Sequence, residues 1–271
     1  MSYYEALGLV KEPFSTSPDP EFFYRSSEHN TALQRLEIAV RLRRGLSLIL
    51  GDIGTGKTTL SRTLLQTFNG EDNFVFKLVL DPAYKSEFQF LAALTKMFGV
   101  NPNFRSTLDY KEAIEKYLFR MGVDENKTII LLIDEGQKLS HPFLEILRTL
   151  LNYETNEYKL LQLVVLAQME LLPRIKRIKN FYDRVTLKYI INPLDEMETR
   201  EMIKFRLHKS GLGPGRELFT PGAIKMIYEQ TLGYPRRIAV LSHNALEYAV
   251  MRDKQIVDEA IMRSVISQEV K

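Results

Sequence analysis

Hydrophobic and polar positions along the chain follow two patterns, short apolar runs and longer segments with helical spacing. Five short, mainly apolar runs predict strands. Leu46–Leu50 suits a short buried strand, and the continuous apolar run Thr128–Ile133 is typical of a strand that is covered on both faces. Most of these runs are separated by segments whose apolar positions recur every three or four residues, which predicts helices. This alternation predicts an α/β fold over residues 30–192, a doubly wound parallel five-stranded sheet. The predicted strands are Leu46–Leu50, Phe74–Leu80, Thr128–Ile133, Leu160–Ala167 and Val185–Ile191.

The helical segments of this region each have an apolar face. In the segment from residue 107 to 121, Leu108, Ile114, Tyr117 and Leu118 are expected to face the core. The predicted helices are Glu28–Arg44, Thr58–Phe68, Ser86–Phe98, Thr107–Met121 and Ser140–Asn152.

The pattern becomes entirely helical after Asn192-Pro193, which is a plausible hinge. Residues 193–271 are therefore expected to form a small all-helical lid, in which Thr220 and Pro221 suit a cap and the first position of a helix. Residues 1–29 are rich in aromatic and turn-forming residues, and they predict a folded-back arm because they are too apolar for a disordered tail. The predicted lid helices are Asp195–Ser210, Pro221–Thr231, Pro235–Met251 and Asp258–Lys271.

Composition narrows the class of protein. The 271 residues are 45% hydrophobic and 26% charged, as in ordinary globular proteins, and the absence of cysteine excludes disulfides and cysteine-ligated metals. The opening lacks the basic start and apolar core of a signal peptide, and no apolar run approaches the ~20 residues of a membrane span. These features predict a cytoplasmic protein. A net charge of +3 is too small to indicate nucleic acid by itself.

The first predicted strand leads into a segment that matches the phosphate-binding pattern G-x-x-x-x-G-K-[ST]. Gly51, Gly54 and Gly56 let the backbone turn so that its N–H groups point at phosphate oxygens, and the next helix directs its N-terminus at the same anion. Lys57 places a positive charge at the β/γ-phosphates, and the Thr58 hydroxyl can ligate Mg²⁺. The alternative is a glycine-rich turn without a ligand. The candidate nucleotide-binding residues are Gly51, Asp52, Ile53, Gly54, Thr55, Gly56, Lys57, Thr58 and Thr59.

Two adjacent carboxylates follow the third predicted strand, in the run IILLIDE. Ligands of open α/β sheets bind outside the carboxyl ends of the strands, so Asp134 is expected beside the phosphate loop, where it can hold Mg²⁺. Glu135 is expected to orient or deprotonate an attacking water. The structural alternative is an acidic turn or helix cap, and the phosphate loop upstream favours the catalytic interpretation.

Two other polar residues are candidates for the same site. Gln168 directly follows the fourth predicted strand and could reach the attacking water or the γ-phosphate; the alternative is a surface loop. Arg236 opens a lid helix in the run GYPRR, where glycine and proline fix a tight entry, and it is expected to point back toward the nucleotide. The alternative for Arg236 is an ion pair with an acid at the start of that helix.

The segment LPRIKRIKNFYDR, residues 172–184, carries five basic residues against one acidic residue. Solvated helix charges are the default interpretation for Arg174, Lys176, Arg177 and Lys179, and a nucleic-acid surface is the competing one. Arg184 differs because it directly precedes the last strand. A guanidinium there could serve as a finger for the γ-phosphate of a neighbouring subunit.

Together these motifs resemble those of an AAA+ ATPase, with Walker A at Gly51–Thr58, Walker B at Ile130–Glu135 and sensor 2 at Gly233–Arg236. Gln168 stands at the sensor 1 position, and Arg184 stands at the finger position. More narrowly, the chain is similar to the ExeA/GspA-like ATPases associated with type II secretion. The matching runs are YYEALGLVKEPFSTSPDPEFFY, GDIGTGKTTL, LLIDEGQKLS, LLQLVVLAQMELL, YDRVTLKYIINPL and GYPRRIAVL, in this order.

The resemblance implies ATP and Mg²⁺ as cofactors and a homo-oligomer, a ring or a filament. In that family the arm packs near the adenine, which makes Pro13 and Phe14 candidate base contacts. Two departures stand out: Gly136 replaces the usual alanine, and these residues contain neither a membrane span nor a peptidoglycan-binding region. Because of the second departure, direct work on the cell wall is not expected.

The expected function is a cytoplasmic AAA+ ATPase that couples Mg-ATP binding and hydrolysis to assembly of a secretion or pilus-type apparatus, with a protein client of that system. One alternative is a DNA-associated ATPase of transposition or replication control, which would use the basic segment. Another is a nucleotide-gated adaptor without useful turnover, against which Glu135 argues.

Overall fold

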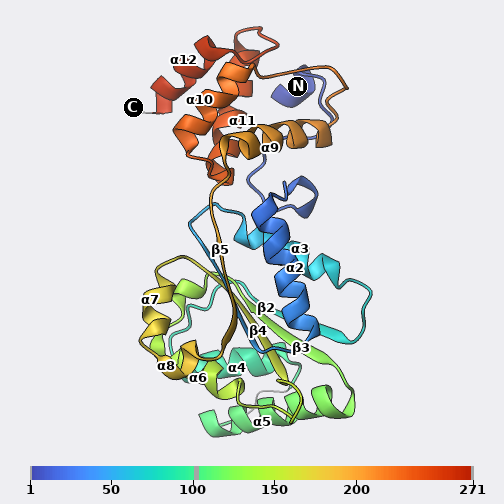
Figure 1. Cartoon of the computed structure of the whole chain (residues 1–271), viewed down its shortest axis with the longest axis vertical. Helices are drawn as coiled ribbons and strands as arrows, with labels where there is room; N and C mark the ends of the chain where they lie inside the picture. The colour runs from blue at the N-terminus through green and yellow to red at the C-terminus, as the bar shows by residue number, and fades with distance from the viewer. Residues whose placement is uncertain (1, 101–103, 270–271) are drawn as a thin grey trace. The chain divides into compact units, whose positions relative to one another are not determined.

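The computed structural model describes residues 2–100 and 104–269. Within these residues, five parallel strands form one sheet in the order β2-β3-β4-β1-β5 (Figure 1). This arrangement confirms the predicted doubly wound α/β fold. The strands are β1 (Leu46–Gly51), β2 (Phe74–Val79), β3 (Thr128–Ile133), β4 (Leu161–Ala167) and β5 (Val185–Ile191).

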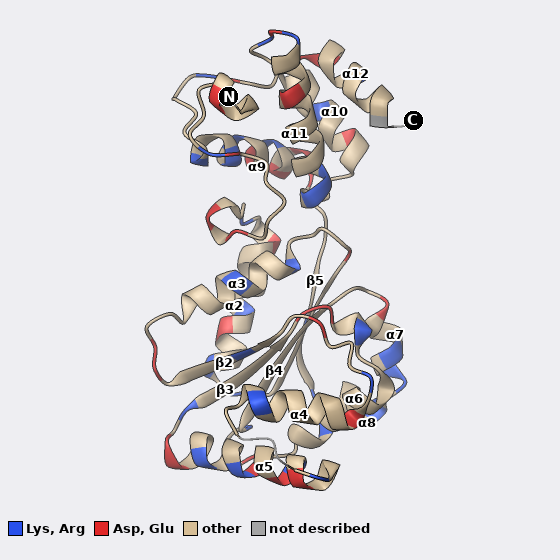
Figure 2. Cartoon of the chain, turned by 180° about the vertical axis from the view of Figure 1, so that it is seen from behind, with Lys and Arg blue, Asp and Glu red and all other residues tan. Residues whose placement is uncertain are grey.

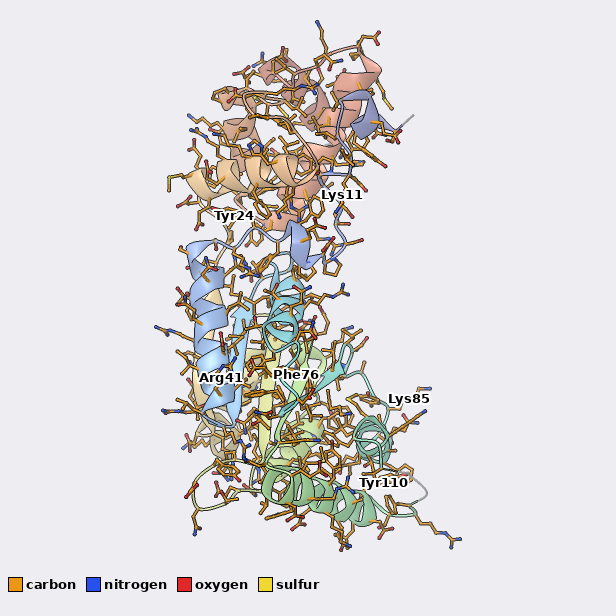
Figure 3. All side chains as sticks on the ribbon, turned by 90° about the vertical axis from the view of Figure 1, so that its right-hand side faces the viewer. Lys11, Tyr24, Arg41, Phe76, Lys85 and Tyr110 are labelled. Carbon is orange, nitrogen blue, oxygen red and sulfur yellow. The ribbon has the colours of Figure 1, made fainter. Side chains whose placement is uncertain are left out.

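The three central strands, β1, β3 and β4, are buried along their whole length, which explains their continuous apolar runs. One face of the sheet packs in a single apolar cluster with helices from α4 to α8. Figures 1 and 3 show α2 and α3 along the other side. At the end of α2, Arg41 binds Glu37 and Glu71 and lies over the Phe68 ring (Figure 3). The helices of this region are α2 (Ser27–Arg41), α3 (Lys57–Thr67), α4 (Glu87–Met97), α5 (Thr107–Phe119), α6 (His141–Leu150), α7 (Leu171–Lys176) and α8 (Lys179–Tyr182).

The helix from residue 107 differs from the prediction in its end and in one core residue. It stops as an α-helix at Phe119 and continues as a π-helical turn, Arg120–Asp124. Leu108 is 62% exposed, so its prediction as a core residue is wrong. The buried stripe is Tyr110, Ile114, Tyr117 and Leu118, and at 3.6 residues per turn Leu108 lies away from it.

The strand register brings the ends of three strands to one edge of the sheet. Leu50 of β1 lies beside Ala167 of β4, and Ile133 of β3 lies beside Val165 of β4. Because the strands are parallel, the chain leaves all three at the same edge. The beginning of the phosphate loop, Gln168 and the acidic pair therefore follow neighbouring strand ends, where open α/β sheets bind their ligands.

The chain divides into two compact units. The α/β unit comprises His29–Ile53 and Leu60–Ile191. The helical unit comprises the residues up to Glu28, the segment Gly54–Thr59, and the residues from Asn192 onward. The division thus passes through the phosphate loop, whose second half is grouped with the helical unit.

The helical unit has its own apolar core, formed by four helices and the N-terminal segment. Leu7, Leu9 and Phe14 of that segment are buried in this core. Tyr3 and His243 share a hydrogen bond of 2.9 Å, and Arg206 donates to the Ser15 carbonyl at 3.0 Å. The elements are α1 (Tyr3–Ala6), the 3₁₀ turn η1 (Pro20–Phe22), α9 (Glu196–Lys209), α10 (Pro221–Thr231), α11 (Pro235–Met251) and α12 (Glu259–Glu269).

Two further expectations from the sequence concern the end of the last helix and the presence of a membrane span. The predicted end of the last helix, at Lys271, lies outside the described residues. No helix in the described part of the chain combines the length and the apolar character that crossing a membrane requires.

Candidate functional site

The chain after β1 turns tightly at two glycines and then enters α3. Gly54 and Gly56 have φ angles of +84° and +94°, in the left-handed region that glycine adopts without steric cost. Thr55 and Lys57 are buried, and α3 begins at Lys57, one residue earlier than predicted. A strand, a glycine turn and a helix N-terminus in this order have the geometry of a phosphate-binding loop.

Within the helical unit, the first turn of α11 contacts this loop segment. The backbone N–H of Arg236 donates to the carbonyl oxygen of Gly54 at 3.2 Å. A Cβ atom on Gly54 would lie 3.0 Å from the Cβ of Arg236, so both the left-handed φ and this neighbour favour glycine. Arg236 therefore lies against a loop residue that was predicted to bind phosphate.

The acidic pair lies directly after β3. Asp134 is 3% exposed, and its backbone N–H donates to the Val79 carbonyl at 2.8 Å, which extends the pairing between β3 and β2. The Asp134 carboxylate accepts the backbone N–H of Glu135 at 2.9 Å. Glu135 has a φ of +53°, an uncommon value for a residue with a side chain. Such backbone strain concentrates at functional sites.

Gln137 contacts two of the predicted site residues, and the sequence reasoning missed it. Its side-chain amide donates to Glu135 Oε2 at 2.7 Å, and its Oε1 accepts the backbone N–H of Gln168 at 3.1 Å. Gln137 is 8% exposed. The only signal in the sequence is a glutamine two residues after the second carboxylate, which has no meaning until the turn Gly136–Lys138 is known.

The same turn is fixed from two other directions. Arg174, on α7, donates to the carbonyl oxygen of Gln137 at 2.6 Å and to that of Leu139. Lys138 pairs with Asp81 at 2.9 Å, and this exposed contact holds the pKa of the Asp81 carboxyl below its usual range. The guanidinium of Arg174 therefore donates to two backbone carbonyl oxygens of this turn, although the residue is exposed. Its interpretation as a solvated charge or a nucleic-acid contact stays a prediction.

Three further basic residues of this segment are also exposed. Lys176, Arg177 and Lys179 are exposed, and Figure 2 shows the positive charges around α7. The segment is not one helix, because α7 ends at Lys176 and α8 begins at Lys179. These three neighbouring side chains are therefore accessible for an electrostatic contact with a partner.

Gly136 replaces an expected alanine in a crowded position. A Cβ atom on Gly136 would overlap Cγ1 of Val165 and would lie 3.2 Å from the Leu166 carbonyl oxygen. Alanine could enter only if β4 or the turn moved, since backbone atoms cannot yield as a flexible side chain can. This glycine therefore permits the close approach of the turn to β4.

Arg184 lies at the opposite edge of the sheet from the phosphate loop. It directly precedes β5, whose first residue, Val185, pairs with Leu46 at the start of β1. At about 3.3 Å per residue, the length of β1 separates this position from Gly51 by roughly 17–20 Å. The guanidinium contacts Asn152 and the Asn180 carbonyl. This distance is too long for the Arg184 side chain to reach a phosphate bound at the loop of its own chain.

Pro13 and Phe14 lie in the N-terminal segment of the helical unit, and both are buried. The Phe14 ring is 1% exposed and meets the Phe219 ring edge to face, with 6.1 Å between centroids. This packing gives Phe14 a structural role in the core. A contact of either residue with an adenine base stays a prediction.

The residues present fit a magnesium nucleotide. The loop supplies left-handed glycines, a buried lysine and a helix N-terminus, all of which favour a polyphosphate. A threonine hydroxyl follows in α3, and a buried carboxylate follows β3, and these hard oxygen donors suit Mg²⁺. When bound, Mg²⁺ would neutralise charge on the transferred phosphoryl group.

Comparisons with known proteins agree with this geometry. A family model described as an AAA domain matches residues 40–175. The general secretion pathway protein A of Aeromonas hydrophila is 34% identical over 259 residues, which cover 92% of this chain and 45% of that protein. This chain therefore spans less than half the length of that relative.

Solved structures share the fold at low identity. ORC2 of Aeropyrum pernix, in ADPNP–ADP complexes, has a TM-score of 0.69 at 18% identity and covers 95% of this chain and 71% of its own. Cdc6p of Pyrobaculum aerophilum has a TM-score of 0.72 at 16% identity, with coverages of 96% and 71%. Drosophila ORC bound to DNA has a TM-score of 0.74 at 18% identity, with coverages of 100% and 66%. The AAA-domain model matches residues 40–175, half of the chain, and these residues include four of the five strands of the parallel sheet. The chain therefore belongs to the AAA family of ATP hydrolases.

Proposed function

We propose that this AAA ATPase couples the binding and hydrolysis of Mg-ATP to the assembly of a secretion or pilus-type apparatus. The observation that carries the proposal is the 34% identity to a general secretion pathway protein over 92% of the chain. That similarity extends well beyond residues 40–175, so it includes more than the core shared by AAA domains. The client would be a protein of that apparatus.

The predicted site residues divide the chemistry among them. The backbone of Gly51–Thr59 and the Lys57 ammonium hold the phosphates, while Thr58 and Asp134 hold Mg²⁺. Glu135 orients or deprotonates the attacking water, and Gln168 lies within reach of it.

Three other residues complete the proposed assignment. Arg236 senses the γ-phosphate from the first turn of α11, and its contact with Gly54 supports that role. Pro13 and Phe14 contact the base.

Arg184 is proposed to complete the site of a neighbouring subunit in a homo-oligomer, since its own loop lies at the other edge of the sheet. We expect Arg184→Ala to bind ATP normally and to hydrolyse it roughly 10³-fold more slowly, because a finger supplied in trans is worth 10³–10⁵ in related reactions. Turnover per subunit should also rise with protein concentration in the parent. Steady-state kinetics combined with light scattering measures both effects.

Mixing Arg184→Ala with Glu135→Gln should restore part of the turnover, because some interfaces then pair an intact base with an intact finger. Arg177→Ala, an exposed arginine of the same segment, serves as the matched control and should turn over as the parent does. A co-assembled mixture that stays inactive would exclude a shared site.

Deleting the gene from its source cells tests the function itself. We expect proteins normally exported by the apparatus to remain inside the cells, because assembly needs ATP turnover. The parent gene should restore export, and Glu135→Gln should not. Quantifying exported proteins in the medium measures this, and export that continues unchanged after the deletion would contradict the proposal.

A DNA-associated ATPase is the second candidate. Its support is the similarity in fold to an ORC structure bound to DNA, together with the exposed cations Lys176, Arg177 and Lys179. A gel shift of duplex DNA that weakens steeply with salt, and that is lost when these three residues become glutamine, would favour it. No shift at low salt would exclude it.

A further inference from the structure

Glu135 is held in an unusual conformation by contacts within the α/β unit. Its φ of +53° places the backbone in the left-handed region, where a side chain is disfavoured. A strained residue keeps one conformation only when its surroundings fix it. The side-chain contact that fixes the carboxylate is the hydrogen bond from Gln137 to Oε2, at 2.7 Å.

The orientation of the Gln137 amide is determined by its two partners. An ionised carboxylate can only accept a hydrogen bond, and a backbone N–H can only donate one. The Nε2 atom therefore faces Glu135, and the Oε1 atom faces the N–H of Gln168. Because Gln137 is 8% exposed, water has little access to either bond.

The turn that carries Gln137 is itself anchored. Arg174 binds its carbonyl oxygen from α7, and the missing side chain of Gly136 lets the turn approach β4. Gln168 directly follows β4, the strand that pairs with both β3 and β1. A chain of hydrogen bonds thus runs from the Glu135 carboxylate to the strand beside β1.

We infer that Gln137 is a positioning residue for hydrolysis, which fixes the Glu135 carboxylate and ties it to the end of β4. The inference rests on the proposed role of Glu135 as the group that activates water. With Oε2 held by the amide, Oε1 is left to face the water in one orientation. A base that is misplaced by about 1 Å can lose up to about 10²-fold in rate.

Two substitutions separate this role from simple support of the fold. Gln137→Met removes both hydrogen bonds at similar size. Gln137→Glu keeps an acceptor for the N–H of Gln168 and loses the donor to Glu135. If the amide acts through Glu135, both variants should lose roughly tenfold in kcat, with KM for ATP within about twofold of the parent.

Gln162→Met is the matched control. Gln162 is 1% exposed on β4, accepts the Gly45 N–H at 2.7 Å and donates to the Lys159 carbonyl at 2.7 Å. Its replacement removes two buried hydrogen bonds from the opposite end of the same strand. We expect it to lower the melting temperature as Gln137→Met does and to leave kcat at the parental value.

A double-mutant cycle completes the test. In a Glu135→Gln background, Gln137→Met should change single-turnover hydrolysis by less than about twofold, because a positioning residue has no effect once its target is lost. An added tenfold loss would overturn the inference, and so would an equal loss of kcat in Gln162→Met.

The remaining outcomes distinguish the inference from its premise. If Glu135→Gln hydrolyses ATP at the parental rate, the role of Glu135 fails and the inference fails with it. If Glu135→Gln is inactive while both Gln137 variants keep the parental kcat, only the inference is overturned. Should Gln137→Met not fold, the isosteric Gln137→Glu decides alone.

Discussion

Lys57→Ala is expected to lower the affinity for ATP by roughly two orders of magnitude. Lys57 is 9% exposed at the first position of α3, so its ammonium would meet the phosphates in a poorly screened environment. Removing one partner of a buried charge pair costs about 2–5 kcal/mol, and each 1.4 kcal/mol is a factor of ten in affinity. Titration of a fluorescent ATP analogue measures the change.

The control for this prediction is Lys225→Ala. Lys225 is an exposed lysine of α10, at 4.0 Å from Glu229, and its loss should leave ATP affinity unchanged. Circular dichroism of both variants should show the parental fold. Near-parental affinity in Lys57→Ala would mean that the loop after β1 does not bind the phosphates.

Glu135→Gln is expected to bind ATP and to hydrolyse it roughly 10²–10⁴-fold more slowly, the range that a positioned acid or base contributes. The substitution keeps the length of the side chain, and an amide oxygen can still accept the hydrogen bond from Gln137. The strained backbone is the same in both proteins. Chemistry should therefore change while nucleotide binding persists, which rapid-quench and equilibrium binding measurements separate.

Glu145→Gln provides the comparison. Glu145 is a partly exposed glutamate of α6 that pairs with Arg148 at 2.8 Å, and neutralising it should leave turnover at the parental value. Asp134→Asn should behave differently from both variants, because Asp134 is proposed to hold Mg²⁺. Its main effect should be on the Mg²⁺ dependence of turnover. Parental turnover in Glu135→Gln would place water activation on another residue.

The fold could be predicted from the sequence because its central strands are buried on both faces. A strand covered on both sides is mostly apolar, and β3 has the predicted bounds. The edge strand β5 also has the predicted bounds, although its residues alternate between partly buried and exposed. The start of α10 was equally predictable, since Thr220 accepts the N–H of Ala223 and Pro221 occupies the first turn. Such signals are local, so they need no knowledge of the neighbouring elements.

Individual side chains were less predictable where their environment comes from distant elements. Leu108 is apolar and helical, yet it is exposed because the buried stripe of α5 lies on another face. Arg174 lies in a basic segment whose composition is typical of solvated charges. Its guanidinium nevertheless donates to two carbonyl oxygens of the turn after β3. Helical spacing accounts for Leu108 once the buried stripe is known, whereas the partners of Arg174 come from a turn that is distant in the sequence.

The sequence by itself determined the α/β class, the phosphate-loop motif and the positions of the two carboxylates, because each depends on residues adjacent in the chain. Only the tertiary structure decided what surrounds Glu135. The strand order places the turn after β3 beside the end of β4, which brings Gln137 and the N–H of Gln168 together across 31 positions. A buried amide has to find partners in the fold, and sequence patterns do not specify which donors and acceptors the packed strands will offer.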